Sequence, residues 1–201
     1  MQRQAPTEQN EEWQRIQCLF QAYLEGDSAV VNSLFSTLSR IVRGFFFART
    51  RSNADSDDLT QATLLKIHLS RHSFDVRLSI KTWVFTIAHR TLIDHWRKRS
   101  RVEPMEALDG ADRASSAGES SEAPIDLSNL IALRSVLEDA LKTLKPLDRS
   151  IVYLGVVEGL SMAELAAVVD STEGAIKVRM HRILRNLRGF INEADAQGER
   201  Q

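Results

Sequence analysis

Apolar residues return every three or four positions along most of this chain, which is the spacing of amphipathic helices. The pattern predicts a first helix over residues 11–25. Gly26 ends it, and the side chain of Asp27 can cap a second helix that extends to Phe45. Glycine and proline number only 9 and 4, and no stretch alternates between apolar and polar residues as a half-buried strand does. We therefore expect an all-α protein.

A polar break over residues 51–56 separates the second helix from a third. Asp57 and Asp58 are expected in the first turn of this third helix, where the positive end of the helix dipole favours carboxylates. Its apolar positions are Leu59, Ala62, Leu65 and Leu69. A loop over residues 71–79 then leads into a fourth helix over residues 80–99. The apolar stripe of that helix should face the core and consists of Val84, Phe85, Ala88, Leu92 and Trp96.

The composition changes over residues 102–128, where serine, glycine and proline replace the periodic apolar positions. Seven acidic residues stand against a single arginine there, which gives a net charge of −6. Such a segment has too little apolar surface to form a core, and we expect a flexible acidic linker. It divides the chain into two helical domains, residues 11–101 and residues 129–191. Helices over residues 130–144 and 146–157 are predicted in the second domain.

The end of the chain has the pattern of a helix-turn-helix. Ser161 and Glu164 have the spacing of a capping box, which starts a short helix over residues 162–169. A turn at Asp170 follows, and then a longer helix over residues 172–190.

On a helical wheel this last helix divides into two faces. The apolar face should hold the helix to its domain and carries Ile176, Met180, Ile183, Leu184 and Leu187. The opposite face carries Lys177, Val178, His181, Arg182 and Arg185. Residues 170–190 contain five basic and two acidic residues, a net charge of +3, and a recognition helix needs a polar outer face of this kind to enter the major groove. An ordinary amphipathic surface helix is the alternative interpretation.

The fourth helix is also basic, with a net charge of +5 over residues 81–101. Trp83 falls on the face opposite the apolar stripe, together with Thr86, Arg90 and Arg97. An aromatic ring beside cations suits unpaired DNA, because a base stacks on the ring and the cations bind phosphates. The alternative interpretation assigns Trp83 to the core and the arginines to a solvated helix end.

The total charge conceals this distribution. Lys and Arg number 26 and Asp and Glu number 27, a net charge of −1 for 201 residues. The single cysteine, Cys18, excludes an intrachain disulfide and a four-cysteine zinc site. The sequence has no signal peptide pattern and no apolar run long enough to span a membrane, so we expect a cytoplasmic protein.

An enzyme is the least favoured class for this chain. His68 and His72 have the spacing of a metal-binding pair on a helix, but no third ligand accompanies them, and a solvated helix edge explains them better. Helix capping explains the aspartates around Asp57. No phosphate-binding glycine loop and no nucleophile motif occurs. We therefore expect no catalytic residue, no metal, no cofactor and no small-molecule substrate.

Two sets of motifs occur in this chain. The first set consists of Asp55–Gln61, Phe74–Asp75, Ile80–Val84, Ile87–Ala88 and Ile93–Asp94. The second set consists of Glu158–Ser161, Glu164–Ala166 and Gly174–Arg182. The first resembles region 2 and the second resembles region 4 of the extracytoplasmic-function (ECF) sigma factors, a subfamily of the sigma-70 sigma factors of bacterial RNA polymerase. Both sets occur in the family's order, which is more specific than a helix-turn-helix alone.

The resemblance implies a promoter-specificity subunit that binds core RNA polymerase and promoter DNA. Region 2 would dock on the polymerase β′ clamp through Asp57, Asp58, Leu59 and Gln61. It would bind and open the −10 element through Phe74, Asp75, Lys81, Trp83, Thr86, Arg90, Arg97 and Arg99, with Trp83 as the wedge and the loop over residues 71–79 around a flipped base. Region 4 would bind the β flap, and it would recognise the −35 element through Thr172, Glu173, Lys177, Val178, His181, Arg182 and Arg185. An anti-sigma factor, membrane-bound in some cases, is a further implied partner.

Two positions depart from the family, since Ala175 and Val178 stand where threonine and serine are common. The bases that the last helix recognises are therefore left open. A helix-turn-helix regulator that does not join the polymerase is the alternative function, although it gives no reason for the segments around Asp57 and Trp83.

Overall fold

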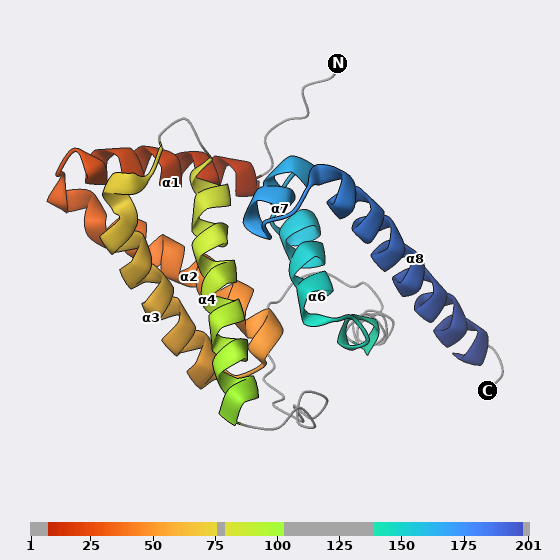
Figure 1. The fold of residues 1–201 in the computed structure, drawn as a ribbon. Coiled ribbons are helices and arrows are strands. Elements are labelled where there is room, and N and C mark those ends of the chain that lie inside the picture. The colour runs from red at the N-terminus through yellow and green to blue at the C-terminus, as the bar shows by residue number, and fades with distance from the viewer. Residues whose placement is uncertain (1–7, 76–78, 103–138, 199–201) are drawn as a thin grey trace, which may run out of the picture.

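The computed structural model describes residues 8–75, 79–102 and 139–198. All regular structure in these ranges is helical, so the prediction of an all-α protein is confirmed. Figure 1 shows the helices in two groups, α1 to α4 and α6 to α8, with α4 standing between α3 and α7. The first residue of the predicted linker, Val102, is the last residue of α4, whereas residues 103–128 of that linker and most of the helix predicted over residues 130–144 lie outside the described residues.

The first helix group contains four α-helices and two short 3-10 turns. Its elements are α1 (Glu8–Leu24), η1 (Ser28–Val30), α2 (Val31–Thr50), α3 (Asn53–Ser70), η2 (Arg71–Ser73) and α4 (Ile80–Val102). Asp27 acts as a cap, as predicted, but it caps the 3-10 turn η1 that precedes α2, where its Oδ1 accepts the N–H of Ala29 at 2.8 Å. Gly26 has a φ of 94°, a conformation that glycine adopts without strain and that ends α1 sharply.

The connection between α2 and α3 is shorter than the sequence pattern indicated. Arg51 takes the left-handed conformation, with a φ of 54°, and Ser52 caps α3 by accepting the N–H of Asp55 on its Oγ at 3.2 Å. Because these two residues complete the turn, α3 begins at Asn53. The predicted polar break over residues 51–56 was therefore wrong, and Asp57 lies in the second turn of α3 rather than the first.

Aromatic and aliphatic side chains from all four helices form the core of the first group. The largest fully buried members are Phe20, Phe45, Phe46, Phe85, Ile16, Leu34, Leu38, Ile67 and Leu92. Helix α3 contributes an unusually polar inner face, with buried Ser56, Thr60 and Thr63 beside Leu59. Leu65 and Leu69, two of the apolar positions of this helix, are 58% and 68% exposed and lie outside the core.

The second helix group contains α6 (Pro146–Val152), a π-helical turn η3 (Tyr153–Val157), α7 (Met162–Val168) and α8 (Glu173–Gly198). The helix predicted over residues 146–157 thus changes to π-helical geometry in its second half. Gly155 lies in this turn, where a Cβ atom would stand 3.1 Å from Cε of Met180. The absence of a side chain therefore allows α8 to approach η3 closely.

The two groups touch, since α7 packs against α4 and α6 packs against α2. Within the part of the chain that the structure describes, no helix is long and apolar enough to cross a membrane.

Candidate nucleic-acid interface

Short-range hydrogen bonds build the predicted helix-turn-helix from α7 and α8. Ser161 Oγ accepts the N–H of Glu164 at 3.2 Å, and Glu164 Oε2 accepts the N–H of Ser161 at 2.9 Å, which completes the capping box. Asp170 takes a left-handed φ of 54° in the turn. Thr172 Oγ1 then accepts the N–H of Ala175 at 3.2 Å and starts α8. The local sequence therefore fixes where α8 begins and the direction in which it leaves α7.

One stripe of α8 holds the helix to its group. Its buried members are Ile176, Met180, Ile183 and Leu187. Leu184 was predicted on this stripe but is 47% exposed, because its position lies at the edge of the apolar arc. An ion pair between Nε of Arg179 and Oδ1 of Asp148, 2.5 Å apart, adds a polar attachment to α6. No role for Arg179 was predicted from the sequence. The signal that could have indicated this ion pair is Asp148, the acidic residue in the first turn of α6.

The opposite stripe of α8 is exposed along its first three turns. It comprises all the residues predicted for the −35 element: Thr172, Glu173, Lys177, Val178, His181, Arg182 and Arg185. Glu173 and Lys177 form an ion pair at 2.6 Å between Oε1 and Nζ. Val178 is 73% exposed, which makes it an apolar contact surface among cations. The structure thus brings the predicted −35 residues together on one accessible face.

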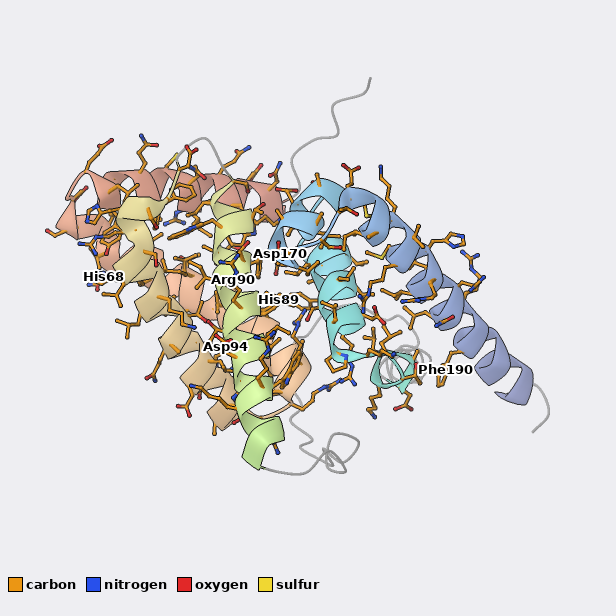
Figure 2. All side chains as sticks on the ribbon, in the orientation of Figure 1. His68, His89, Arg90, Asp94, Asp170 and Phe190 are labelled. Atoms are coloured by element: carbon orange, nitrogen blue, oxygen red, sulfur yellow. The ribbon has the colours of Figure 1, made fainter. Side chains whose placement is uncertain are left out.

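The residues predicted for the −10 element are divided between solvent and interior. Arg90, Arg97 and Arg99 are exposed on α4, and Figure 2 shows Arg90 beside His89 on this helix. Arg99 forms an ion pair with Asp55 of α3 at 3.8 Å. Thr86 is half-buried, and its hydroxyl donates to the carbonyl of Thr82 at 2.8 Å.

Trp83 is half-buried in an aromatic cluster rather than placed freely on the outer face of α4. Its ring centre lies 5.0 Å from that of Phe74 and 5.4 Å from that of Phe20. Phe74 is only 8% exposed and meets Phe20 edge-on at 5.3 Å. Phe74 is too deeply buried to contact DNA directly. We therefore infer that Phe74 holds the ring of Trp83 in position. Asp75, next to it, is exposed at the start of the loop.

Lys81 lies between the two helix groups. Its ammonium group donates to the main-chain carbonyl of Glu158 in the second group and stands 5.7 Å from the ring centre of Trp13. Burial lowers the pKa of Lys81, and the nearby carboxylates of Glu158 and Glu164 act against that shift. Lys81 was predicted to contact a DNA phosphate. In this structure its ammonium group binds the main chain of the protein instead.

The residues predicted for polymerase docking lie on α3. Asp57, Asp58 and Gln61 are exposed, whereas Leu59 is 6% exposed and belongs to the core, so it cannot form part of the outer face. Asp57 Oδ1 accepts a hydrogen bond from Nε of Arg43 at 2.6 Å. The exposed Leu65 and Leu69 follow Gln61 at helical spacing, as Leu65 is four and Leu69 eight positions further along α3.

His68 and His72, the two histidines considered as a metal-binding pair, are not joined by a third possible ligand among the described residues. Nδ1 of His68, which Figure 2 labels, is 2.5 Å from the hydroxyl of Tyr23. The ring centre of His68 is 6.4 Å from that of Phe35. Among the residues that the structure describes, no group of three histidine, cysteine or carboxylate side chains is placed to hold a metal.

Comparison with known proteins relates both helix groups to one family. Residues 34–102 match the model of sigma-70 region 2, and residues 134–187 match the model of sigma-70 region 4. The ECF RNA polymerase sigma factor SigF of Caulobacter vibrioides is 33% identical over 182 residues, which cover 90% of this chain and 96% of the relative. The RNA polymerase sigma factor CarQ of Myxococcus xanthus is 31% identical over 175 residues, 87% and 97% of the two chains.

Solved structures agree with these relationships. The sigma factor RpoE from Bartonella quintana, in complex with the anti-sigma factor NepR, superposes with a TM-score of 0.61 at 25% identity and covers 80% of this chain and 96% of its own. CnrH, in complex with the cytosolic domain of CnrY, gives a TM-score of 0.62 at 18% identity over 88% and 97% of the two chains, a likeness of fold. The chain therefore belongs to the ECF subfamily of sigma-70 RNA polymerase sigma factors.

Proposed function

We propose that this sigma factor directs core RNA polymerase to its promoters by dividing recognition between two domains. Residues 11–101 bind the polymerase and the −10 element, residues 129–191 bind the −35 element, and residues 102–128 connect them. The observation that carries the proposal is the outer face of α8, where every residue predicted for the −35 element is exposed and a buried stripe fixes the opposite side.

At the −35 element, the first turns of α8 enter the major groove, as the second helix of a helix-turn-helix does. Lys177, Arg182 and Arg185 supply cations for phosphates and guanine edges. Glu173 and His181 lie on the same face and contribute polar contacts. Thr172 lies at the start of the helix, where the helix N-terminus favours a phosphate.

At the −10 element, the exposed arginines of α4 bind the backbone of the melted strand, and Trp83 offers the surface on which a base stacks. Base stacking on an aromatic side chain contributes about 1–3 kcal/mol, enough to offset part of the cost of unpairing. Phe74 and Phe20 fix the plane of the indole from behind. Asp75 lies where the following loop would meet an extruded base.

Docking on the polymerase follows from the outer face of α3. Asp57, Asp58 and Gln61 contact the β′ clamp, and the exposed Leu65 and Leu69 add apolar area to the same face. Region 4 contacts the β flap. The chain itself carries out no catalysis and takes no small-molecule substrate, since nucleotide addition belongs to the polymerase that it joins in the bacterial cytoplasm.

Regulation by an anti-sigma factor is part of the proposal. Support comes from the Bartonella quintana relative, whose structure was solved with its anti-sigma factor NepR. An anti-sigma factor that covers α3 or α8 would withhold this chain from the polymerase or from the −35 element.

Run-off transcription with purified core polymerase on the DNA upstream of the chain's own gene tests the function. We expect a specific transcript that depends on the chain. A helix-turn-helix regulator outside the polymerase would instead bind DNA without the core enzyme and would fail to co-purify with it, so a pull-down with core polymerase separates the two functions.

A further inference from the structure

Recognition of bases by α8 depends on the roll of this helix about its own axis. A helix with its side chains is about 10–12 Å across, so a roll of about 20° moves the outer end of a side chain by about 2 Å. A hydrogen bond does not survive that shift, since its donor–acceptor distance lies between about 2.7 and 3.2 Å. A flexible lysine can follow a phosphate through the same shift, but phosphate contacts carry no sequence information. The roll of α8 therefore decides how well one DNA sequence is distinguished from another.

The apolar stripe of α8 gives only part of this orientation. Ile176, Ile183 and Leu187 form its middle and are almost fully buried. Apolar contacts are non-directional, so they resist a small roll less than a hydrogen bond does. At about 100° per residue, Arg179 and Met180 fall on opposite sides of this stripe, and each makes a more specific contact.

The contact of Met180 is steric. A Cβ atom on Gly155 would stand 3.1 Å from Cε of Met180, so the main chain of η3 limits the approach of α8 on this side. The contact of Arg179 is directional, because its Nε donates to Oδ1 of Asp148 on α6 at 2.5 Å. The side chain of Asp148 is 10% exposed and that of Arg179 is 29% exposed. A charge-assisted hydrogen bond between partly buried groups is short and keeps a defined geometry.

Asp148 is itself held by the start of α6. It lies in the first turn of this helix, which begins at Pro146, and a carboxylate is favoured at that end of a helix. The next residue, Arg149, donates from Nε to the carbonyl of Leu144 at 3.0 Å and from a terminal nitrogen to the carbonyl of Lys142 at 3.2 Å. These bonds tie the first turn of α6 to the chain that precedes it. Arg179 is thus attached to a fixed point.

We propose that the ion pair between Arg179 and Asp148 is a positioning contact for promoter recognition. It sets the roll of α8, so that Val178, the residue before Arg179, and Arg182, one turn further along, meet base edges of the −35 element. Arg179 then touches no DNA, although it is a cation of the recognition helix, and Asp148 acts on base discrimination through Arg179. The inference rests on the proposed function, because the roll of α8 matters only if this helix recognises the −35 element.

A phosphate contact is the competing role for Arg179, and the two roles give opposite expectations for Asp148. If Arg179 binds phosphate, loss of the Asp148 carboxylate frees a cation for DNA and leaves base discrimination as it was. If Arg179 positions α8, the same loss lets the helix roll and lowers base discrimination, although the charge of the DNA-binding domain becomes more positive.

Competition run-off transcription with the reconstituted holoenzyme tests the proposal. Two templates of different length share one reaction: the first carries the −35 element upstream of the chain's own gene, and the second carries a single base change in that element. The ratio of the two transcripts measures base discrimination. A variant that is partly unfolded lowers both transcripts and leaves their ratio unchanged, so the ratio reports positioning and not stability.

The variants are Asp148→Ala, Arg179→Met, which keeps most of the aliphatic stem, and both changes together. Asp139→Ala is the matched control, since Asp139 is an exposed carboxylate ahead of α6 that pairs with Lys142 and not with α8. Arg179→Lys keeps the cation but loses the planar guanidinium.

We expect the wild-type chain to prefer its own −35 element at least tenfold over the most harmful single change. Asp148→Ala and Arg179→Met should each lower that ratio at least threefold, and the double variant should lower it no further, because either change already breaks the pair. Arg179→Lys should retain part of the ratio, and Asp139→Ala should retain all of it.

A wild-type ratio in Asp148→Ala overturns the positioning role, and so does a double variant in which the two losses add. Failure of the proposed function looks different, since the wild-type chain would then show no preference at any position of the −35 element.

Discussion

The guanidinium carbon of Arg49 on α2 lies 4.5 Å from the ring centre of Tyr153 in η3, so an aromatic residue of region 4 covers a buried cation of region 2. A cation–π contact at a desolvated site contributes roughly 2 kcal/mol. Tyr153→Ala should therefore lower the free energy of unfolding by about 2 kcal/mol, whereas Tyr153→Phe keeps the ring and should retain the stability. Urea denaturation of the two variants measures both. Equal free energies of unfolding for the two variants would mean that the ring contributes nothing to the contact.

Trp83 gives a second prediction, because its ring is held by Phe74 at 5.0 Å yet stays half-exposed. Trp83→Ala removes the stacking surface and should slow promoter opening at least tenfold, while Trp83→Phe retains part of the activity. Fluorescence of 2-aminopurine in the −10 element reports the opening. A template that is already unpaired over this element should largely rescue the alanine variant. Native affinity for core polymerase serves as the folding control, and an unimpaired rate of opening on duplex DNA would exclude the wedge role.

Much of this architecture could be predicted from local sequence signals. Asp27, Ser161 and Glu164 cap helices as expected, because capping depends on residues only two or three positions apart. The exposed face of α8 followed from its period of 3.6 residues. The start of α3 was missed because Arg51, a residue with no special preference for it, adopts the left-handed conformation that glycine usually supplies.

Long-range packing decided what the sequence could not predict. Helix α3 packs through a partly polar face of serine, threonine, leucine and isoleucine side chains, so its apolar positions Leu65 and Leu69 stay exposed. A helical wheel placed Trp83 on the outer face of α4, although Phe20, distant in sequence, draws it partly inward. The contacts between Arg49 and Ser150 span 101 positions, and no local pattern indicates them.

The basic face of α8 gives a third prediction. Lys177→Ala and Arg182→Ala should each weaken binding to a −35 duplex about tenfold, because each removes a cation from the turns that enter the groove. Arg188→Ala is the matched control, since Arg188 is an exposed arginine of the same helix about 16 Å beyond Lys177. Fluorescence anisotropy across a salt series measures the affinities, and the first two variants should also show a shallower salt dependence. If all three variants lost the same amount of affinity, the effect would come from the net charge of the helix and not from contacts in the groove.

Val178 gives a prediction about sequence specificity. It is 73% exposed between cations on the face of α8 proposed for the groove, and an apolar side chain there matches the methyl group of thymine. Burial of one methyl group contributes about 0.8 kcal/mol, so replacing the contacted thymine with deoxyuridine should weaken binding about fourfold.

A scan of single thymine-to-deoxyuridine changes through the −35 duplex locates the contact. Val178→Ser should remove the sensitivity at that one thymine and leave the other positions unchanged, whereas Val178→Thr, which keeps one methyl group, should retain part of it. If no thymine in the duplex is sensitive with the wild-type chain, Val178 does not contact a methyl group.

The last prediction concerns His89, which is 5% exposed on α4 and whose Nδ1 has no hydrogen-bond partner among the described residues. Burial, reinforced by the positive charge of Arg49 on α2, lowers the pKa of this imidazole to about 4. An unfolded histidine has a pKa of about 6.5, so between pH 6.5 and pH 4 the unfolded chain binds the proton more strongly. Stability that is present above pH 6.5 is therefore lost as the pH falls through this range.

From pH 7 to pH 5, proton binding by His89 should lower the free energy of unfolding by about 2 kcal/mol. His89→Leu removes the titrating group, and its loss of stability over the same interval should be smaller by that amount in urea denaturation at the two pH values. Burial raises the pKa of Glu158, which acts in the opposite direction, but both chains share this contribution and it cancels in the difference. His72→Leu, at an exposed position of η2, is the matched control for replacing a histidine with leucine. Parallel pH profiles for the wild-type chain and His89→Leu would show that His89 is not held neutral by its burial.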